Sequence, residues 1–130
     1  MIEVNRILLS IFIAIFVIAA IYLAMFINTN QVIDDIANVV SGNVDKTITN
    51  GLPIDFFNRQ GQSGTVSVNY NIKRLFVLHN FREGYIWIRY TWQGYDNFGK
   101  RTYSSVNIPC CLKIQKANGK WVIIQVSVAP

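Results

Sequence analysis

The feature that most constrains this chain is an apolar run near its N-terminus. All residues in the range 7–27 are apolar or aromatic except Ser10. At about 1.5 Å of rise per residue, a helix of this length spans roughly 31 Å, which matches a bilayer hydrocarbon core of about 30 Å. The run therefore predicts a single transmembrane helix over residues 7–27, preceded by a short tail over residues 1–6.

Charges on either side of the run predict its orientation. Arg6 and the α-amino group precede the run, whereas the first cation after it is Lys46. The positive-inside rule therefore favours a cytoplasmic N-terminus and an extracytoplasmic domain over residues 28–130. The alternative is a signal peptide cleaved after the small residues 18–20, but the apolar region of such a peptide is only about 7 to 15 residues long. We expect an uncleaved, single-pass anchor in the cell membrane, held there by contact with lipid.

Residues 28–130 are enough for one domain with one core, and their charge is uneven. The range 28–55 has a net charge of −3, whereas the range 56–130 has ten Lys and Arg against two acids, a net charge of +8. A basic surface can bind a polyanion such as lipid headgroups or anionic cell-wall polymer, or can simply keep a sheet soluble. An extracytoplasmic position argues against nucleic acid. If a polyanion site exists, we expect one patch containing Lys73, Arg74, Arg89, Lys100 and Arg101.

An amphipathic helix is predicted over about 31–50. Apolar residues recur there at steps of three and four, which places them on one helix face. This stripe consists of Val32, Ile33, Ile36, Val39, Val40, Val44 and Ile48. Gly51 and Pro53 are residues that end helices. Gly42 would lie inside the helix and weaken it by about 0.5 to 1 kcal/mol relative to alanine.

The rest of the chain predicts a connecting loop and four strands. The loop reaches Gly64 and contains the aromatic pair Phe56 and Phe57. Alternating apolar residues then predict strands over about 65–79, 85–95, 101–116 and 120–128, and Asn118-Gly119 predicts the last hairpin turn. A helix laid across a curved, four-stranded antiparallel meander would bury the helix stripe and one sheet face. The predicted fold class is therefore α+β.

This element order resembles two cone-shaped α+β families, the nuclear transport factor two-like and cystatin-like folds. The segment 118–123, with its Asn-Gly turn and following strand, is similar to the end of the former, and the likeness covers residues 30–130. Inhibitory cystatins carry a Q-x-V-x-G loop that residues 62–66 do not match, so protease inhibition is not implied. A single span before such a cone also resembles the bitopic assembly components of bacterial type IV secretion and conjugation machines, which implies a scaffold role.

Residues suited to catalysis are few. His79 is the single histidine, and we expect it to be a hydrogen-bonding residue at a strand end. An acid–base pair would have to draw on Asp55, Glu83 or Asp96, all of which lie in predicted turns or loops. A zinc site at His79 and the two cysteines would need a fourth ligand, and adjacent strand residues point to opposite faces. No catalytic residue, metal or cofactor is predicted.

Binding residues can be proposed from the strand pattern. Tyr85, Trp87 and Arg89 share the sheet face away from the helix, which predicts a surface for another envelope protein or a second copy of the chain. Cys110 has the parity of core residues, so Cys111 is the candidate reactive thiol. The favoured function is a non-catalytic envelope binding or assembly module. The alternatives are a small-ligand binder or enzyme of the cone fold, and a polyanion-binding module.

Overall fold

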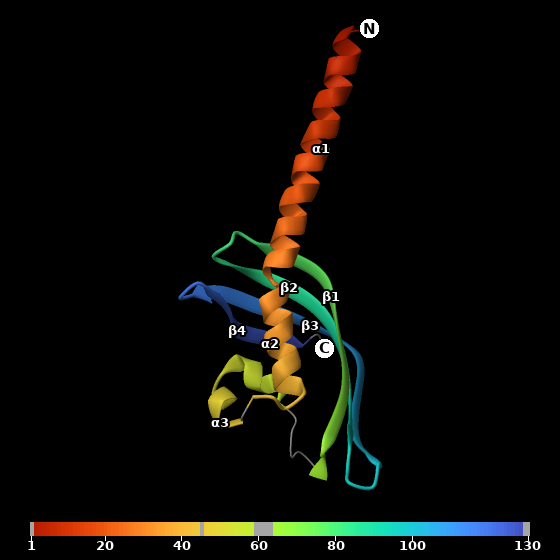
Figure 1. Cartoon of the computed structure of the whole chain (residues 1–130), viewed down its shortest axis with the longest axis vertical. Helices are drawn as coiled ribbons and strands as arrows, with labels where there is room; N and C mark the ends of the chain where they lie inside the picture. Colours follow the sequence, from red (N-terminus) through yellow and green to blue (C-terminus); the bar gives the residue numbers. More distant parts are fainter. Residues whose placement is uncertain (1, 45, 59–63, 129–130) are drawn as a thin grey trace.

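The computed structural model describes residues 2–44, 46–58 and 64–128 and confirms the α+β class. In Figure 1 most of a long N-terminal helix stands clear of the domain, and a second helix continues from its lower end across a curved sheet. The first helix is long and apolar enough to cross a membrane. The elements are α1 (Ile2–Asn28), α2 (Asn30–Val40), α3 (Lys46–Thr49), the 3-10 helix η1 (Pro53–Phe57), β1 (Ser67–His79), β2 (Glu83–Tyr95), β3 (Arg101–Ala117) and β4 (Lys120–Val128).

The sheet is an antiparallel meander in the order β1-β2-β3-β4, as expected. Each strand begins and ends within two residues of its predicted bounds. Register shifts interrupt the pairing in all three hairpins, for example between Arg74 and Phe76 in β1. Such irregularities bend a strand and increase its twist, which accounts for the curvature of the sheet around α2.

The core lies between the concave sheet face and the helices. Ile86, Ile88, Tyr90 and Trp92 of β2 are buried, and so are Val32, Ile36, Val39 and Val40 of α2. These residues form one hydrophobic cluster, as the periodicity of the helix and the strand predicted. The aromatic pair of the loop closes the cluster, because the buried Phe57 ring lies 5.9 Å from Tyr90 and 6.0 Å from Trp92.

The predicted helix over 31–50 is interrupted, since α2 ends at Val40. Gly42 has a φ of +82° and donates its N–H to Val39 O at 3.2 Å, while Asn43 donates to Asn38 O at 2.9 Å. These two bonds make a Schellman motif, in which glycine is favoured because it adopts positive φ without steric cost. Gly42 is therefore the residue that ends α2. As a consequence Ile48 leaves the apolar stripe and is 67% exposed.

The two long helices meet without a linker. Only Thr29 separates α1 from α2; it is fully buried, and both its N–H and its Oγ1 donate to Phe26 O.

The loop residues 59–63, which include part of the segment compared with the cystatin loop, lie outside the described residues.

Candidate functional site

The last turns of α1 pack directly on β1. The Tyr22 ring lies 5.8 Å from the Phe76 ring, and Val77 N donates to Tyr22 Oη at 3.3 Å. Tyr22 belongs to the apolar run that predicted the membrane span. The edge of the sheet therefore contacts α1 at a residue of the apolar run.

Arg74 binds the C-terminal end of α1. Its Nη1 donates to Phe26 O and to Thr29 Oγ1, both at 2.9 Å, and its Nη2 donates to Asn30 Oδ1 at 2.7 Å. The guanidinium also lies 3.8 Å from the centre of the Phe26 ring. The last carbonyls of a helix have no partner within the helix and carry partial negative charge, which a cation satisfies. Burial lowers the pKa of Arg74, and the charge of Asp34 opposes that shift.

His79 makes a further hydrogen bond between the sheet and α1. It is buried, its Nδ1 accepts a hydrogen bond from Phe81 N at 2.9 Å, and its Nε2 lies 2.9 Å from Met25 O. Because Nδ1 accepts, the neutral ring carries its proton on Nε2, which donates to the Met25 carbonyl. Both ring nitrogens are thus engaged. His79 is a hydrogen-bonding strand-end residue, as the sequence suggested, and its ring offers no vacant nitrogen to act as a base.

The contact of Arg74 and His79 with the end of α1 was not predicted from the sequence, although one feature of the sequence indicated it. Alternation along β1 gives Arg74 the parity of Ile72, which packs against the core, and places Lys73 on the opposite face. A cation at a core-facing strand position requires a polar partner nearby. That partner, the end of α1, was recognisable only in three dimensions.

Tyr85, Trp87 and Arg89 lie on the sheet face away from α2. Tyr85 and Trp87 are exposed, and their rings are 5.9 Å apart. Trp87 also packs on Phe76, at 5.3 Å between ring centres. Arg89 is exposed, and its Nη1 donates to Asn107 O at 3.3 Å. The structure therefore gathers the three residues along one outward-facing stretch of β2.

The expected single basic patch does not form. Lys73 is the cross-strand neighbour of Arg89 on the outer face, whereas Arg74 is turned towards the helices. Lys100 and Arg101 lie at the β2–β3 turn, where Arg101 pairs with Tyr95. Tyr95 is six residues along β2 from Arg89, a separation of about 20 Å. The five cations are thus divided among three places.

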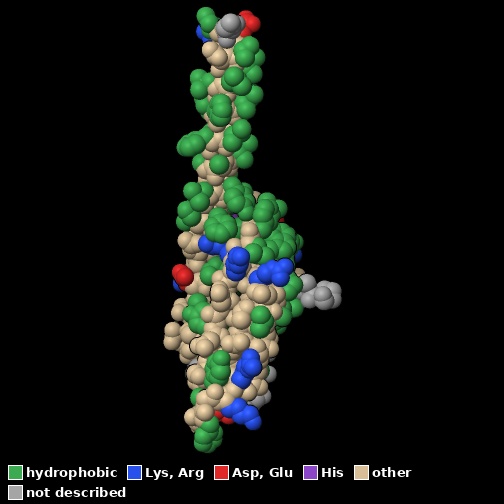
Figure 2. Space-filling model, turned by 90° about the vertical axis from the view of Figure 1, so that its right-hand side faces the viewer, with side chains coloured by type: hydrophobic (Ala, Val, Ile, Leu, Met, Phe, Trp, Pro, Cys, Tyr) green, Lys and Arg blue, Asp and Glu red, His purple; other side chains and the backbone are tan. Residues whose placement is uncertain are grey.

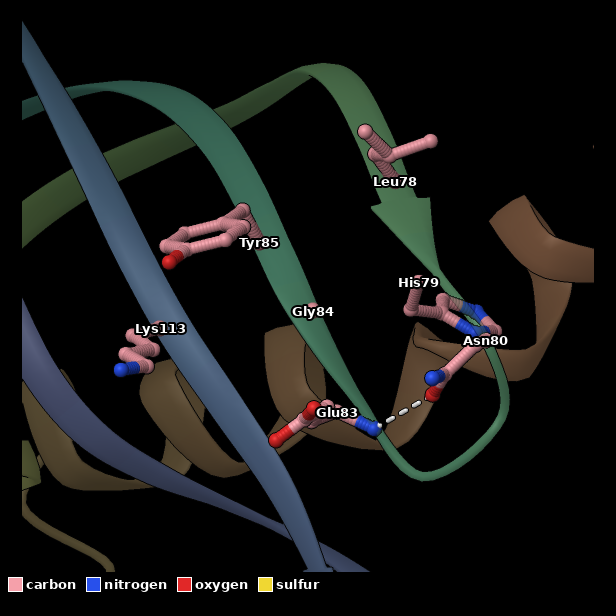
Figure 3. Close-up of a pocket in the computed structure, with 7 residues that line it drawn as sticks. All are labelled: Leu78, His79, Asn80, Glu83, Gly84, Tyr85 and Lys113. Carbon is pink, nitrogen blue, oxygen red and sulfur yellow. Dashed lines mark hydrogen bonds between the residues drawn. The ribbon is translucent and has the colours of Figure 1, made fainter.

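A groove on the outer face lies at the β1–β2 turn (Figure 3). It has a volume of about 400 Å³ and is lined by Leu78, His79, Asn80, Glu83, Gly84, Tyr85 and Lys113. Figure 3 shows Tyr85 and Lys113 at one end and Asn80 and Glu83 at the other, where Glu83 N donates to Asn80 Oδ1 at 3.0 Å. The groove brings a histidine and an acid together, but the nitrogens of that histidine are already bonded. This arrangement can hold a small ligand and lacks a free acid–base pair.

Both cysteines are free thiols whose reactivity is reduced. Burial raises the pKa of Cys110 to about 11, with the neighbouring Cys111 as a second cause. Burial also raises the pKa of Cys111, the candidate reactive thiol. The thiolate is the nucleophilic form, so a raised pKa slows reaction near neutral pH. In the part of the chain that the structure describes, no group of three His, Cys, Asp or Glu could hold a metal ion.

Comparisons with protein-family models, curated proteins and solved structures found no match to this chain. The structure establishes an apolar N-terminal helix followed by a helix and a four-stranded antiparallel sheet. The resemblance to the cone-shaped families stays a hypothesis based on this order of elements.

Proposed function

We propose that this chain is a single-pass membrane protein that displays a small cone-like domain outside the membrane as a binding or assembly module without catalytic activity. The observation that carries the proposal is the direct junction between α1 and the sheet. Arg74 and His79 bond the last carbonyls of α1, and no linker separates that helix from α2. A domain joined in this way keeps a set angle to its anchor. Such rigidity suits a module whose partners are fixed in or near the same membrane.

The outer sheet face is the proposed binding surface. Tyr85, Trp87 and Arg89 are of the residue types enriched among the energetically dominant residues of protein interfaces. The aromatic rings add large, rigid contact area, and the Arg89 guanidinium can bind a carboxylate with two parallel hydrogen bonds. The proposed partner is another envelope protein or a second copy of this chain.

A small-ligand binder is the second candidate, favoured by the groove at the β1–β2 turn. Lys113 and Tyr85 could bind an anionic or hydroxylated ligand there. Because the ring nitrogens of His79 are engaged, this candidate is a binder and not an enzyme. A polyanion-binding module remains the third candidate, and it predicts an affinity that falls steeply with added salt.

Chemical crosslinking of the full chain in native membranes tests the binding surface. Arg89→Ala should reduce the crosslinked product several-fold without changing the melting temperature, because it removes a surface cation and no core contact. Lys100→Ala, at the β2–β3 turn, is the matched control and should leave the product unchanged. Equal yields from the Arg89→Ala variant and the unmodified chain would show that this face is not the binding surface.

Labelling of an introduced cysteine tests the orientation. Phe98, at the β2–β3 turn, is 94% exposed. Phe98→Cys should therefore react with a membrane-impermeant maleimide in intact cells stripped of any outer barrier. It should react faster than the unmodified chain, in which Cys110 is buried and Cys111 is partly buried. Reaction only after lysis would place the domain in the cytoplasm and contradict the proposal.

A further inference from the structure

An apolar surface lies where the sheet meets the anchor. Phe76 and Leu78 of β1 and Phe81 of the β1–β2 turn are 45%, 52% and 43% exposed, and we call them the hairpin patch. Figure 1 places this turn at the end of the sheet beside α1. In Figure 2, hydrophobic side chains continue from the base of the helix onto the domain, with Lys and Arg gathered just below them. Because the Phe76 ring packs on the Tyr22 ring of α1, the hairpin patch is continuous with the apolar surface of that helix.

Contacts with α1 fix the depth of this patch relative to the membrane span. Phe76 packs on Tyr22, and His79 bonds Met25 O. Tyr22 precedes the end of the apolar run, at Ile27, by five residues, or about 7.5 Å of helix. Since the length of the run matches a hydrocarbon core, its end marks the boundary between acyl chains and headgroups. Strand residues packed beside Tyr22 and Met25 then lie at or within that boundary.

Moving α1 partly out of the bilayer, so that the hairpin no longer lies at the interface, would be unfavourable. Leu23 and Ile27, which lie in the last turns of α1, are 58% and 53% exposed, because the sheet does not cover them. Moving α1 outwards until the hairpin clears the membrane would bring both side chains into water. The depth that buries Leu23 and Ile27 in lipid is the depth that brings the hairpin to the interface.

The backbone at Phe81 is an independent observation. Phe81 has a φ of +68°, a conformation that bulky residues rarely adopt and that glycine or asparagine would adopt readily. The hydrogen bond from Phe81 N to His79 Nδ1 holds it there, with the two rings 4.8 Å apart at nearly a right angle. A strained position in a turn thus holds a large, exposed apolar side chain at the end of the sheet nearest the anchor. Strained backbone conformations cluster at functional sites.

Charges beside the hairpin complement a membrane surface. Arg82 is exposed in the turn, and Lys113, the cross-strand neighbour of Tyr85, lines the outer-face groove. Glu83 is the one acid among the residues that line this groove. Cations near the surface of a bilayer are attracted to its anionic headgroups, and aromatic side chains gather at the same level.

We infer that the hairpin patch inserts into the interface of the bilayer that holds α1, while Arg82 and Lys113 face its anionic headgroups. The inference rests on the proposed function for the placement of α1 in a membrane. It adds a second, monotopic contact that fixes the tilt of the domain. The apolar hairpin side chains then contact lipid. Tyr85 and Trp87, the cross-strand neighbours of Leu78 and Phe76, lie at the same level, so a partner that binds them does so at the membrane surface.

Tryptophan quenching in vesicles tests this inference. The full chain is reconstituted into phosphatidylcholine and phosphatidylglycerol vesicles in which part of the phosphatidylcholine is brominated near the headgroup end of its acyl chains. In a Trp87→Phe background, Phe81→Trp places a reporter at the proximal turn, and Phe98→Trp places a matched reporter at the distal turn. The two remaining tryptophans, Trp92 and Trp121, are buried and contribute the same signal to both variants.

Quenching should be several-fold stronger for Phe81→Trp than for Phe98→Trp, and stronger with phosphatidylglycerol than without it. Equal quenching of the two reporters, or none of either, in protein that floats with the vesicles would overturn the inference and leave the proposed function standing. Failure to float with vesicles after an alkaline wash would overturn both. If Phe81→Trp does not fold, Leu78→Trp provides the same comparison.

Discussion

The side-chain amide of Gln31 pairs with both backbone groups of Trp121. Its Oε1 accepts a hydrogen bond from Trp121 N, and its Nε2 donates to Trp121 O, each at 3.0 Å. Trp121 lies on β4, an edge strand, so a side chain of α2 takes the place that a neighbouring strand would occupy. Trp121 Nε1 also donates to Asn28 Oδ1 at 2.8 Å. The edge opposite β1 is thereby tied to the same helix junction that Arg74 and His79 bind.

Loss of the Gln31 amide should loosen this edge. Gln31→Ala leaves the N–H and C=O of the buried Trp121 without these partners, and we expect a loss of about 1 to 3 kcal/mol in the free energy of unfolding. Urea denaturation of the full chain in detergent measures the change. Gln125→Ala, an exposed position on the same strand, is the control and should change stability by less than about 0.5 kcal/mol. Similar losses of unfolding free energy in the two variants would show that Gln31 does not stabilise this edge of the sheet.

Arg74 should contribute far more to stability than its neighbour. Arg74→Gln removes three charge-assisted hydrogen bonds at the end of α1, and a loss of roughly 2 to 3 kcal/mol is expected. Lys73→Gln changes an exposed side chain on the outer face and should be close to neutral. Thermal melting of both variants in the same detergent gives the comparison. A neutral result for Arg74→Gln would mean that the junction does not depend on this cation.

A charge in the core stripe should unfold the domain. Ile36 is fully buried between α2 and the sheet, so Ile36→Asp either buries an unpaired carboxylate or disrupts the core, at a cost above about 4 kcal/mol. Asn38→Asp adds the same charge at an exposed position of the same helix and should leave the protein folded. Arg89→Ala should also stay folded. Circular dichroism of the three variants measures the outcome, and native spectra from Ile36→Asp would overturn the assignment of the helix face.

Stability should fall as the pH rises into the alkaline range. Burial raises the pKa of Cys110 to about 11, above the value of about 8.5 for a free thiol. The folded protein therefore keeps a proton that the unfolded chain releases, so the contribution of this group is complete below about pH 8.5 and is lost by about pH 11. Cys110→Ala should flatten the dependence of unfolding free energy on pH across this window. Identical slopes for the variant and the unmodified chain would contradict the shift.

The prediction of the fold from the sequence depended on the spacing of apolar residues within single helices and strands. Alternation in β2 identified Ile86, Ile88, Tyr90 and Trp92 as the buried face, because adjacent strand residues point to opposite sides of a sheet. The same periodicity brought Tyr85, Trp87 and Arg89 to the outer face. The sequence did not predict the end of α2 at Val40, because a glycine such as Gly42 can have either of two effects. It weakens a helix when it lies inside the helix, and it ends a helix when it follows the last turn.

The sequence by itself determined the apolar span, the order of the elements and the faces of the strands, because these depend on the spacing of side chains along the chain. Only the tertiary structure decided how the domain meets α1. Arg74 and Phe26 are 48 residues apart, and Gln31 and Trp121 are 90 apart. No periodicity links residues so distant. Their hydrogen bonds depend on the curvature of the whole sheet and on the place where α1 ends, which are properties of the folded chain.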